Sequence, residues 1–82
     1  MPVRLASIIY ERHIRIWRLR LEPDATGAGD KAGDLVGFGG NIHDPDDELR
    51  VTMHLAGWGV RPELGGWRDE AGTWVVPVVR LS

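Results

Sequence analysis

The alternation of apolar and polar positions along this chain predicts short β-strands rather than helices. Residues 3–22 contain no strong turn signal, and on a helical wheel their apolar side chains would scatter around the axis. Fully extended, this stretch would span roughly 65 Å, whereas a compact domain of this length has a radius of gyration of only about 12 Å. We therefore expect a reversal near Glu11–Arg12 that pairs Val3–Tyr10 with His13–Glu22, in preference to one long bent strand that reaches a neighbouring subunit.

The second half of this expected hairpin changes the phase of its alternation. In "HIRIWRLRLE", residues 13–22, the apolar positions are even-numbered up to Ile16 and odd-numbered from Trp17 onward. Because successive side chains of a strand point to opposite faces, one extra residue at this point would restore a single apolar face. The pattern therefore predicts a β-bulge between Ile16 and Trp17.

Further along the chain, apolar runs alternate with segments rich in glycine and acidic residues. Residues 23–33, "PDATGAGDKAG", predict a solvated, mobile loop, and "HDPDDE" predicts a second, acidic loop. The strands expected after them are Leu35–Phe38, Leu49–Leu55, Trp67–Asp69 and Thr73–Leu81, of which Leu49–Leu55 has the most regular alternation. Glu70–Ala71–Gly72 predicts a hairpin turn. Pro77 has no amide donor, which indicates a sheet edge or a bulge.

Together these elements predict an all-β fold, a small antiparallel meander of five or six strands curled into a barrel or sandwich. A chain of 82 residues is expected to form a single β domain over residues 1–82. A domain this small buries only about 60–65% of the surface that its unfolded chain exposes. With no cysteine for disulfides or thiolate-held metal, oligomerisation is the remaining common supplement to the core.

Charge changes this picture because it is segregated along the chain. Residues 1–22 carry five arginines and two acidic residues, residues 23–49 carry one lysine and seven acidic residues, and residues 50–82 carry four arginines and three acidic residues. Such polarity is expected to steer a charged partner, or to be satisfied within the molecule or between two copies of it.

Arginine and tryptophan supply the candidate binding residues. The candidates are Arg15, Trp17, Arg18, Arg20, Trp58 and Trp67. Arginines interleaved with aromatic residues are typical of nucleic-acid binders, yet a pI near 5.8 disfavours that class. The alternative is that the arginines pair with the acidic middle of the chain. Trp17 and Trp74 lie in expected strands and favour a core position, whereas Trp58 and Trp67 fit a core plug and an exposed anchor equally well.

No segment matches a catalytic or cofactor motif, and we expect no cofactor. Gly-x-Ser-x-Gly and phosphate-loop spacings are absent from the sequence, so His13, His54 and Tyr10 are only weak catalytic candidates. Asp44, Asp46 and Glu48 offer oxygen ligands of the kind that calcium uses, but they lack the EF-hand pattern, and solvated turn chemistry explains them as well. We therefore expect no metal site.

The sequence thus favours a small non-catalytic binding or assembly module that acts as a homo-oligomer, most simply a dimer, through sheet edges and an Arg/Trp surface. The alternative is a small β-barrel enzyme or carrier for an apolar small molecule, of the cyclase or isomerase type. A nucleic-acid-binding module is third. Without a membrane span or a signal sequence, the chain is expected to be cytoplasmic, with a protein or small molecule as a further partner.

Overall fold

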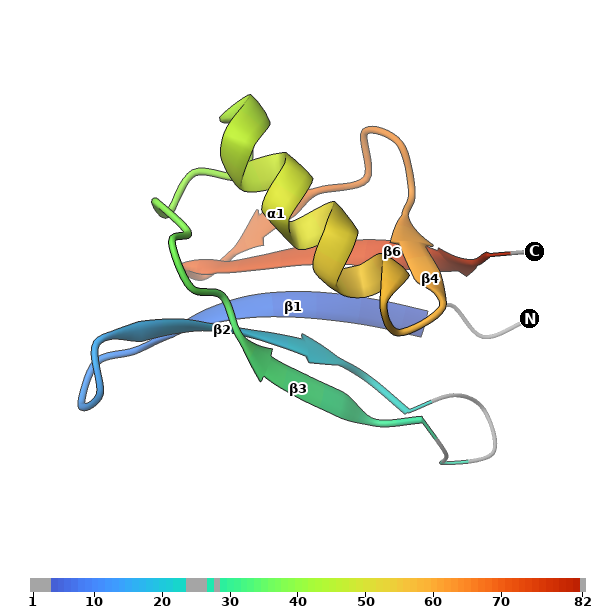
Figure 1. Cartoon of the computed structure of the whole chain (residues 1–82), viewed down its shortest axis with the longest axis horizontal. Helices are drawn as coiled ribbons and strands as arrows, with labels where there is room; N and C mark the ends of the chain where they lie inside the picture. Colours follow the sequence, from blue (N-terminus) through green and yellow to red (C-terminus); the bar gives the residue numbers. More distant parts are fainter. Residues whose placement is uncertain (1–3, 24–26, 28, 82) are drawn as a thin grey trace.

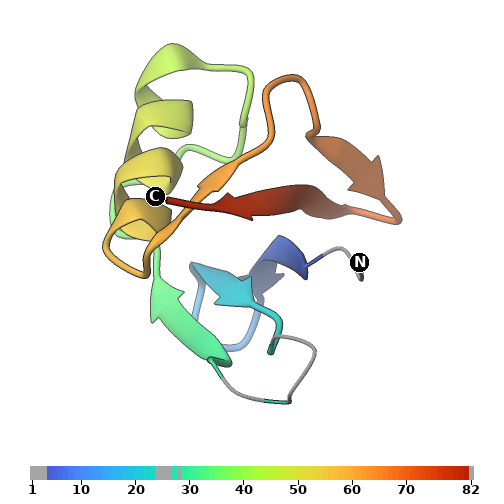
Figure 2. The same cartoon turned by 90° about the vertical axis from the view of Figure 1, so that its right-hand side faces the viewer.

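The computed structural model describes residues 4–23, 27 and 29–81 and contains one curled antiparallel sheet and one α-helix (Figure 1). In chain order the elements are β1 (Arg4–Glu11), β2 (Ile16–Leu21), β3 (Lys31–Asp34), α1 (Pro45–Ala56), β4 (Val60–Pro62), β5 (Arg68–Glu70) and β6 (Thr73–Arg80). The strand order is β3-β2-β1-β6-β4, and β5 also pairs with β6. The predicted fold class is confirmed: six antiparallel strands form a half-barrel, and α1 lies across one face of it (Figure 2).

The first two strands form the hairpin expected from the sequence. Their register runs without interruption from Ala6 opposite Leu21 to Glu11 opposite Ile16, and residues 12–15 form the turn. Arg15 adopts a φ of 55°, in the left-handed region that closes tight turns. The predicted β-bulge between Ile16 and Trp17 is wrong, because the phase change marks the start of the strand rather than a defect inside it. Val3, the predicted first residue of the hairpin, lies outside the described residues.

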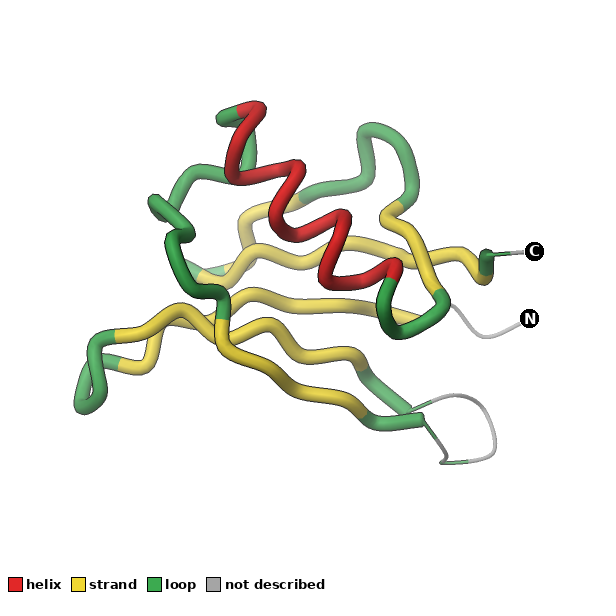
Figure 3. The backbone as a smooth tube through the Cα atoms, viewed as in Figure 1, coloured by secondary structure: helices red, strands yellow, loops and turns green. Residues whose placement is uncertain are grey.

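The third strand lies earlier in the chain than its hydrophobic pattern indicated. A strand was expected at Leu35–Phe38, but the residues that pair with β2 are Lys31–Asp34, and 35–44 form an irregular connection (Figure 3). The predicted loop 23–33 was therefore too long by three residues at its end; its residues 24–26 and 28 lie outside the described part of the chain. Leu35 and Phe38 are apolar because they enter the core from a loop, being 6% and 7% exposed.

The segment Leu49–Leu55, predicted as the most regular strand, belongs to the helix α1 (Pro45–Ala56). The preceding acidic residues supply the helix start: the side chain of the N-cap residue Asp44 accepts a hydrogen bond of 2.9 Å from the Asp46 amide, and Pro45 follows at the first helical position. Acidic side chains in the first turn complement the positive end of the helix dipole. Asp47, Val51 and Leu55 are the buried residues, and their spacing of four places them on one helical face.

A single layer of side chains between the sheet and α1 forms the core. Its buried apolar members are Ala6, Ile8, Leu19, Leu21, Leu35, Phe38, Ile42, Val51, Leu55, Val60, Val76 and Val78, and four half-buried tryptophans pack against them. In the central strands these members alternate with residues that face the other side of the sheet, as strand geometry requires. The sheet therefore has one face covered by α1 and one face without a covering layer.

The last hairpin agrees with the sequence, and it shows how a proline fits inside a sheet. Ala71 and Gly72 have φ values of 55° and 84°, and the Asp69 carboxylate accepts a hydrogen bond from the Gly72 amide. Pro77 lies in β6, between β1 and the β4–β5 side. Its carbonyl accepts from the Glu63 amide, so its ring nitrogen also faces that side, where the chain between β4 and β5 leaves the ladder. Pro77 is thus accommodated where the neighbouring strands β4 and β5 are interrupted, and not at the predicted sheet edge or bulge.

Candidate functional site

The uncovered face of the sheet carries an apolar strip along its two central strands. Because Ala6, Ile8, Val76 and Val78 face α1, the intervening residues of β1 and β6 face away from it. We define the outer strip as Leu5, Ile9, Val75, Pro77 and Val79; each of these side chains is half-buried except Ile9, which is 39% exposed. Leu5 lies directly opposite Pro77 across the β1–β6 ladder. The strip is mostly apolar: Ser7 lies on the same face between Leu5 and Ile9, opposite Val75, and segment 63–66 borders Leu5 and Pro77.

Charged side chains of both signs flank the outer strip. On the side of β2 and β3, Arg18 Nε lies 3.4 Å from Asp34 Oδ1, and Arg20 Nε lies 3.5 Å from Asp30 Oδ1. At the other side, on β5, Arg68 lies 3.2 Å from the carboxylate of Glu70. The arginines of "RLR" therefore meet the acidic middle of their own chain. Exposed pairs of this kind contribute about 0–1 kcal/mol each, so they leave the arginine heads available to a partner.

The structure separates the other predicted binding residues. Arg15 is exposed in the β1–β2 turn and belongs to none of the arginine–carboxylate pairs of the sheet. Trp17 lies on the α1 side, where its ring contacts those of Tyr10 and Phe38 at centroid distances of 5.1 and 5.2 Å. The backbone of Gly40 approaches the Trp17 indole so closely that a Cβ there would lie 3.1 Å from it. Tyr10 and Trp17 thus belong to an aromatic cluster that extends the core.

His54, a catalytic candidate, and Trp58, a binding candidate, lie next to each other. Their rings meet edge-to-face at a centroid distance of 4.9 Å, four residues apart around the end of α1. Gly33 of β3 makes this arrangement possible, since a Cβ at that position would lie 2.6 Å from His54 Nε2. The catalytic candidate His13 is exposed in the β1–β2 turn and lies 3.8 Å from Glu11, at the opposite end of the sheet from the end of α1 (Figure 1). The three catalytic candidates therefore do not form one site.

The residues suggested as calcium ligands have separate roles in α1. Asp44 caps the helix, and Asp46 and Glu48 follow on different sides of its first turn. Within residues 4–23, 27 and 29–81, no three histidine or acidic side chains gather closely enough to hold a metal ion. In the same part of the chain, no helix is long and apolar enough to cross a membrane.

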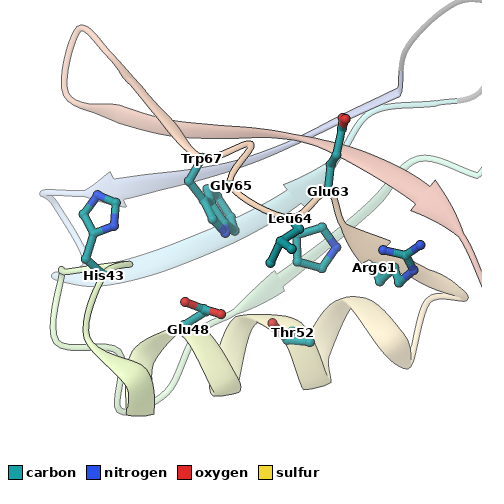
Figure 4. Close-up of a pocket in the computed structure, with 9 residues that line it drawn as sticks. His43, Glu48, Thr52, Arg61, Glu63, Leu64, Gly65 and Trp67 are labelled. Atoms are coloured by element: carbon teal, nitrogen blue, oxygen red, sulfur yellow. The ribbon is translucent and has the colours of Figure 1, made fainter.

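A groove that the sequence did not indicate runs between α1 and the segment 61–67 (Figure 4). It has a volume of about 440 Å³, and the residues that line it are His43, Glu48, Thr52, Arg61, Pro62, Glu63, Leu64, Gly65 and Trp67. The Trp67 indole extends from one wall toward α1, and the Glu48 carboxylate extends from α1 toward the indole. The His43 ring stands at one end, in edge-to-face contact with Trp74 at 5.4 Å. Of these residues, only Trp67 and Glu48 were sequence candidates.

Two surfaces thus remain after the predicted residues have been placed: the outer strip with its charged flanks, and the groove beside α1. A signal for the first was present in "TWVVPVVR", which is apolar at nearly every position and so indicates a strand with apolar contacts on both faces. The groove left no such signal, because its walls lie far apart in sequence and its shape depends on the packing of α1 against β4. No protein-family model, no curated protein and no solved structure matches this chain.

Proposed function

We propose that this chain is a non-catalytic assembly module that works as a homodimer, with the uncovered faces of two sheets packed against each other. The outer strip carries the proposal. It places five apolar side chains on the two central strands, on the face opposite α1, which segment 63–66 borders at Leu5 and Pro77. A second sheet stacked on this face at the usual spacing of about 10 Å would remove the strip from water.

Charge on both sides of the outer strip favours a second copy over other partners. An interface between proteins commonly has an apolar centre and a polar rim, and the strip with its flanks has this arrangement. Arg18 and Arg20 stand on one flank beside Asp34 and Asp30, so a rotated copy can meet each sign with the opposite sign. A nucleic acid would meet the same carboxylates as well as the arginines. For this reason we consider a nucleic acid a less suitable partner than a second copy of the chain.

The edge strands of the sheet are less suited to dimerisation than this face. β4 and β5 have three residues each, and β4 ends in Pro62, which has no amide donor to offer a further strand. β3 has four residues and begins with an exposed lysine, Lys31, a side chain that protects edges from pairing. The sequence suggested association through sheet edges and an Arg/Trp surface; we instead assign the association to the apolar sheet face, with Arg18 and Arg20 at its rim.

Sedimentation equilibrium at micromolar concentrations is expected to give twice the mass of one chain. Ile9→Glu is expected to weaken the association at least about tenfold, because it places a carboxylate in the apolar contact, at the end of the strip nearest the β1–β2 turn. The single chain tolerates this change, since Ile9 lies opposite Arg18 and is already part exposed.

The matched control is Ile14→Glu. It makes the same change at a side chain that is 45% exposed, but in the β1–β2 turn and away from the outer strip. Its dimer dissociation constant is expected to stay within about twofold of the wild-type value. A wild-type chain that remains monomeric at high micromolar concentration, or an Ile14→Glu variant that dissociates as readily as Ile9→Glu, contradicts the proposal.

A further inference from the structure

The groove between α1 and segment 61–67 has the dimensions of a ligand site. Its volume of about 440 Å³ lies within the range of about 300–1,000 Å³ that is usual for small-molecule sites. Apolar surface comes from Pro62, Leu64 and the Trp67 indole, and polar groups come from α1 and from the segments on either side of it. Leu64 is 96% exposed, so its side chain is open to contact with an incoming molecule.

The helix presents two polar side chains to this groove. Glu48 and Thr52 are four residues apart, so they lie on the same side of α1, and both line the groove. The Glu48 carboxylate points across the groove toward the face of segment 61–67 that carries Trp67 (Figure 4). In the part of the chain that the structure describes, Glu48 belongs to none of the ion pairs, which involve Glu11, Asp30, Asp34 and Glu70.

A carboxylate that faces an indole across a gap is complementary to an organic cation. The indole face attracts a cation through its quadrupole, and the carboxylate supplies the opposite charge and a charge-assisted hydrogen bond. Of the two acidic residues that line the groove, Glu48 extends its carboxylate into it and Glu63 points away from it (Figure 4). The carboxylate that a cation would meet is therefore that of Glu48.

We propose that this groove binds a lysine or arginine side chain presented by a partner polypeptide. The aliphatic stem lies along Leu64 and the Trp67 ring, the cationic head lies between the indole and Glu48, and the Thr52 hydroxyl accepts a further hydrogen bond. The groove lies between α1 and segment 61–67, and the same segment borders the outer strip at Leu5 and Pro77 on its other side. This site would give the assembly module a specific partner.

Binding is tested by titrating the full-length, isotope-labelled chain with N-acetyl-lysine methylamide and following its amide resonances. The neutral probe is N-acetyl-norleucine methylamide, which has the same stem without the ammonium group. Lysine is expected to shift the amides of residues 48–52 and 64–67, with an affinity at least about tenfold above that of norleucine, because only lysine forms the charged contacts. Equal affinities for the two probes would overturn the proposal.

Glu48→Gln is expected to remove the preference for lysine over norleucine, because it keeps the shape of the side chain and removes its charge. Glu63→Gln is the matched control: it makes the same change at the rim, where the side chain points away from the groove (Figure 4), and the preference should stay within about twofold. An equal loss in both variants would mean that general acidity, and not this site, attracts the cation. Putrescine, a free diamine, distinguishes the source of the cation; tighter binding of putrescine than of blocked lysine would overturn the polypeptide assignment.

Discussion

Leu55→Ala is expected to lower the free energy of unfolding by about 2–5 kcal/mol, the usual range for a buried leucine in a close-packed core. Leu55 is fully buried on the face of α1 that packs against the sheet. A chain of this length has a total stability of roughly 4–12 kcal/mol at the usual 0.05–0.15 kcal/mol per residue, so this loss is a large part of it. Urea unfolding, followed by tryptophan fluorescence at one fixed protomer concentration, measures the effect.

Leu49→Ala and Met53→Ala are the matched controls on the same helix. Their side chains are 57% and 65% exposed, and each substitution is expected to change the free energy of unfolding by less than about 0.5 kcal/mol. A strand at this position would place Leu49, Met53 and Leu55 on one face, and the three substitutions would then have similar effects. Such a result would contradict the helix.

The helix shows why this part of the fold was mispredicted. Leu49, Val51, Met53 and Leu55 alternate with polar residues, and this period of two indicates a strand, although Asp44 caps a helix just before it. The alternation is accidental, because only Val51 and Leu55 are buried, and their spacing of four is helical. The acidic segment before them contained the correct signal, a capping aspartate followed by proline and three acidic residues. The same residue types also favour a solvated loop, so the signal is not specific.

Strands were predicted well where local pattern and turn chemistry agreed. The turn at Ala71–Gly72 follows from such signals, whereas the β1–β2 hairpin, which has no strong turn signal, follows from the length of its apolar stretch; both occur as expected. β3 could not be found this way, since Lys31–Asp34 has weak strand propensity and pairs because it lies beside β2 with Asp34 opposite Arg18. Its position depends on a tertiary contact.

Of the two candidate surfaces, only the outer strip could have been predicted from the sequence. A strand that is apolar on both faces, as β6 is, indicates that the sheet needs a second cover, and this could have located the outer strip. The groove depends on the approach of α1 to β4, which brings Glu48 near Trp67 from nineteen positions away in the sequence. Neither residue type nor spacing predicts that approach, because it is set by how Val51 and Leu55 pack into the core.

Asp47→Ala is expected to lower the free energy of unfolding by about 2–4 kcal/mol. The Asp47 carboxylate accepts hydrogen bonds from two partly buried backbone amides, which lose this acceptor in the variant. One oxygen accepts from the Gly39 amide at 3.0 Å and the other from the Asn41 amide at 3.3 Å, and the residue is only 7% exposed. Hydrogen bonds to a charged group contribute about 1.5–3 kcal/mol each, and partial access of water to the freed amides reduces their sum.

Two further variants separate the contribution of the Asp47 hydrogen bonds from that of acidic charge at the start of α1. Asp46→Ala removes an exposed neighbouring carboxylate and should lower the free energy of unfolding by no more than about 1 kcal/mol, the usual effect of the helix dipole. Asp47→Asn keeps the shape and one acceptor oxygen but turns an amide group toward one donor, so an intermediate loss is expected. Equal losses for Asp46→Ala and Asp47→Ala would show that the connection before α1 is held by other contacts. Since His43 lies in that connection, its edge-to-face contact with Trp74 should loosen only when Asp47 is replaced.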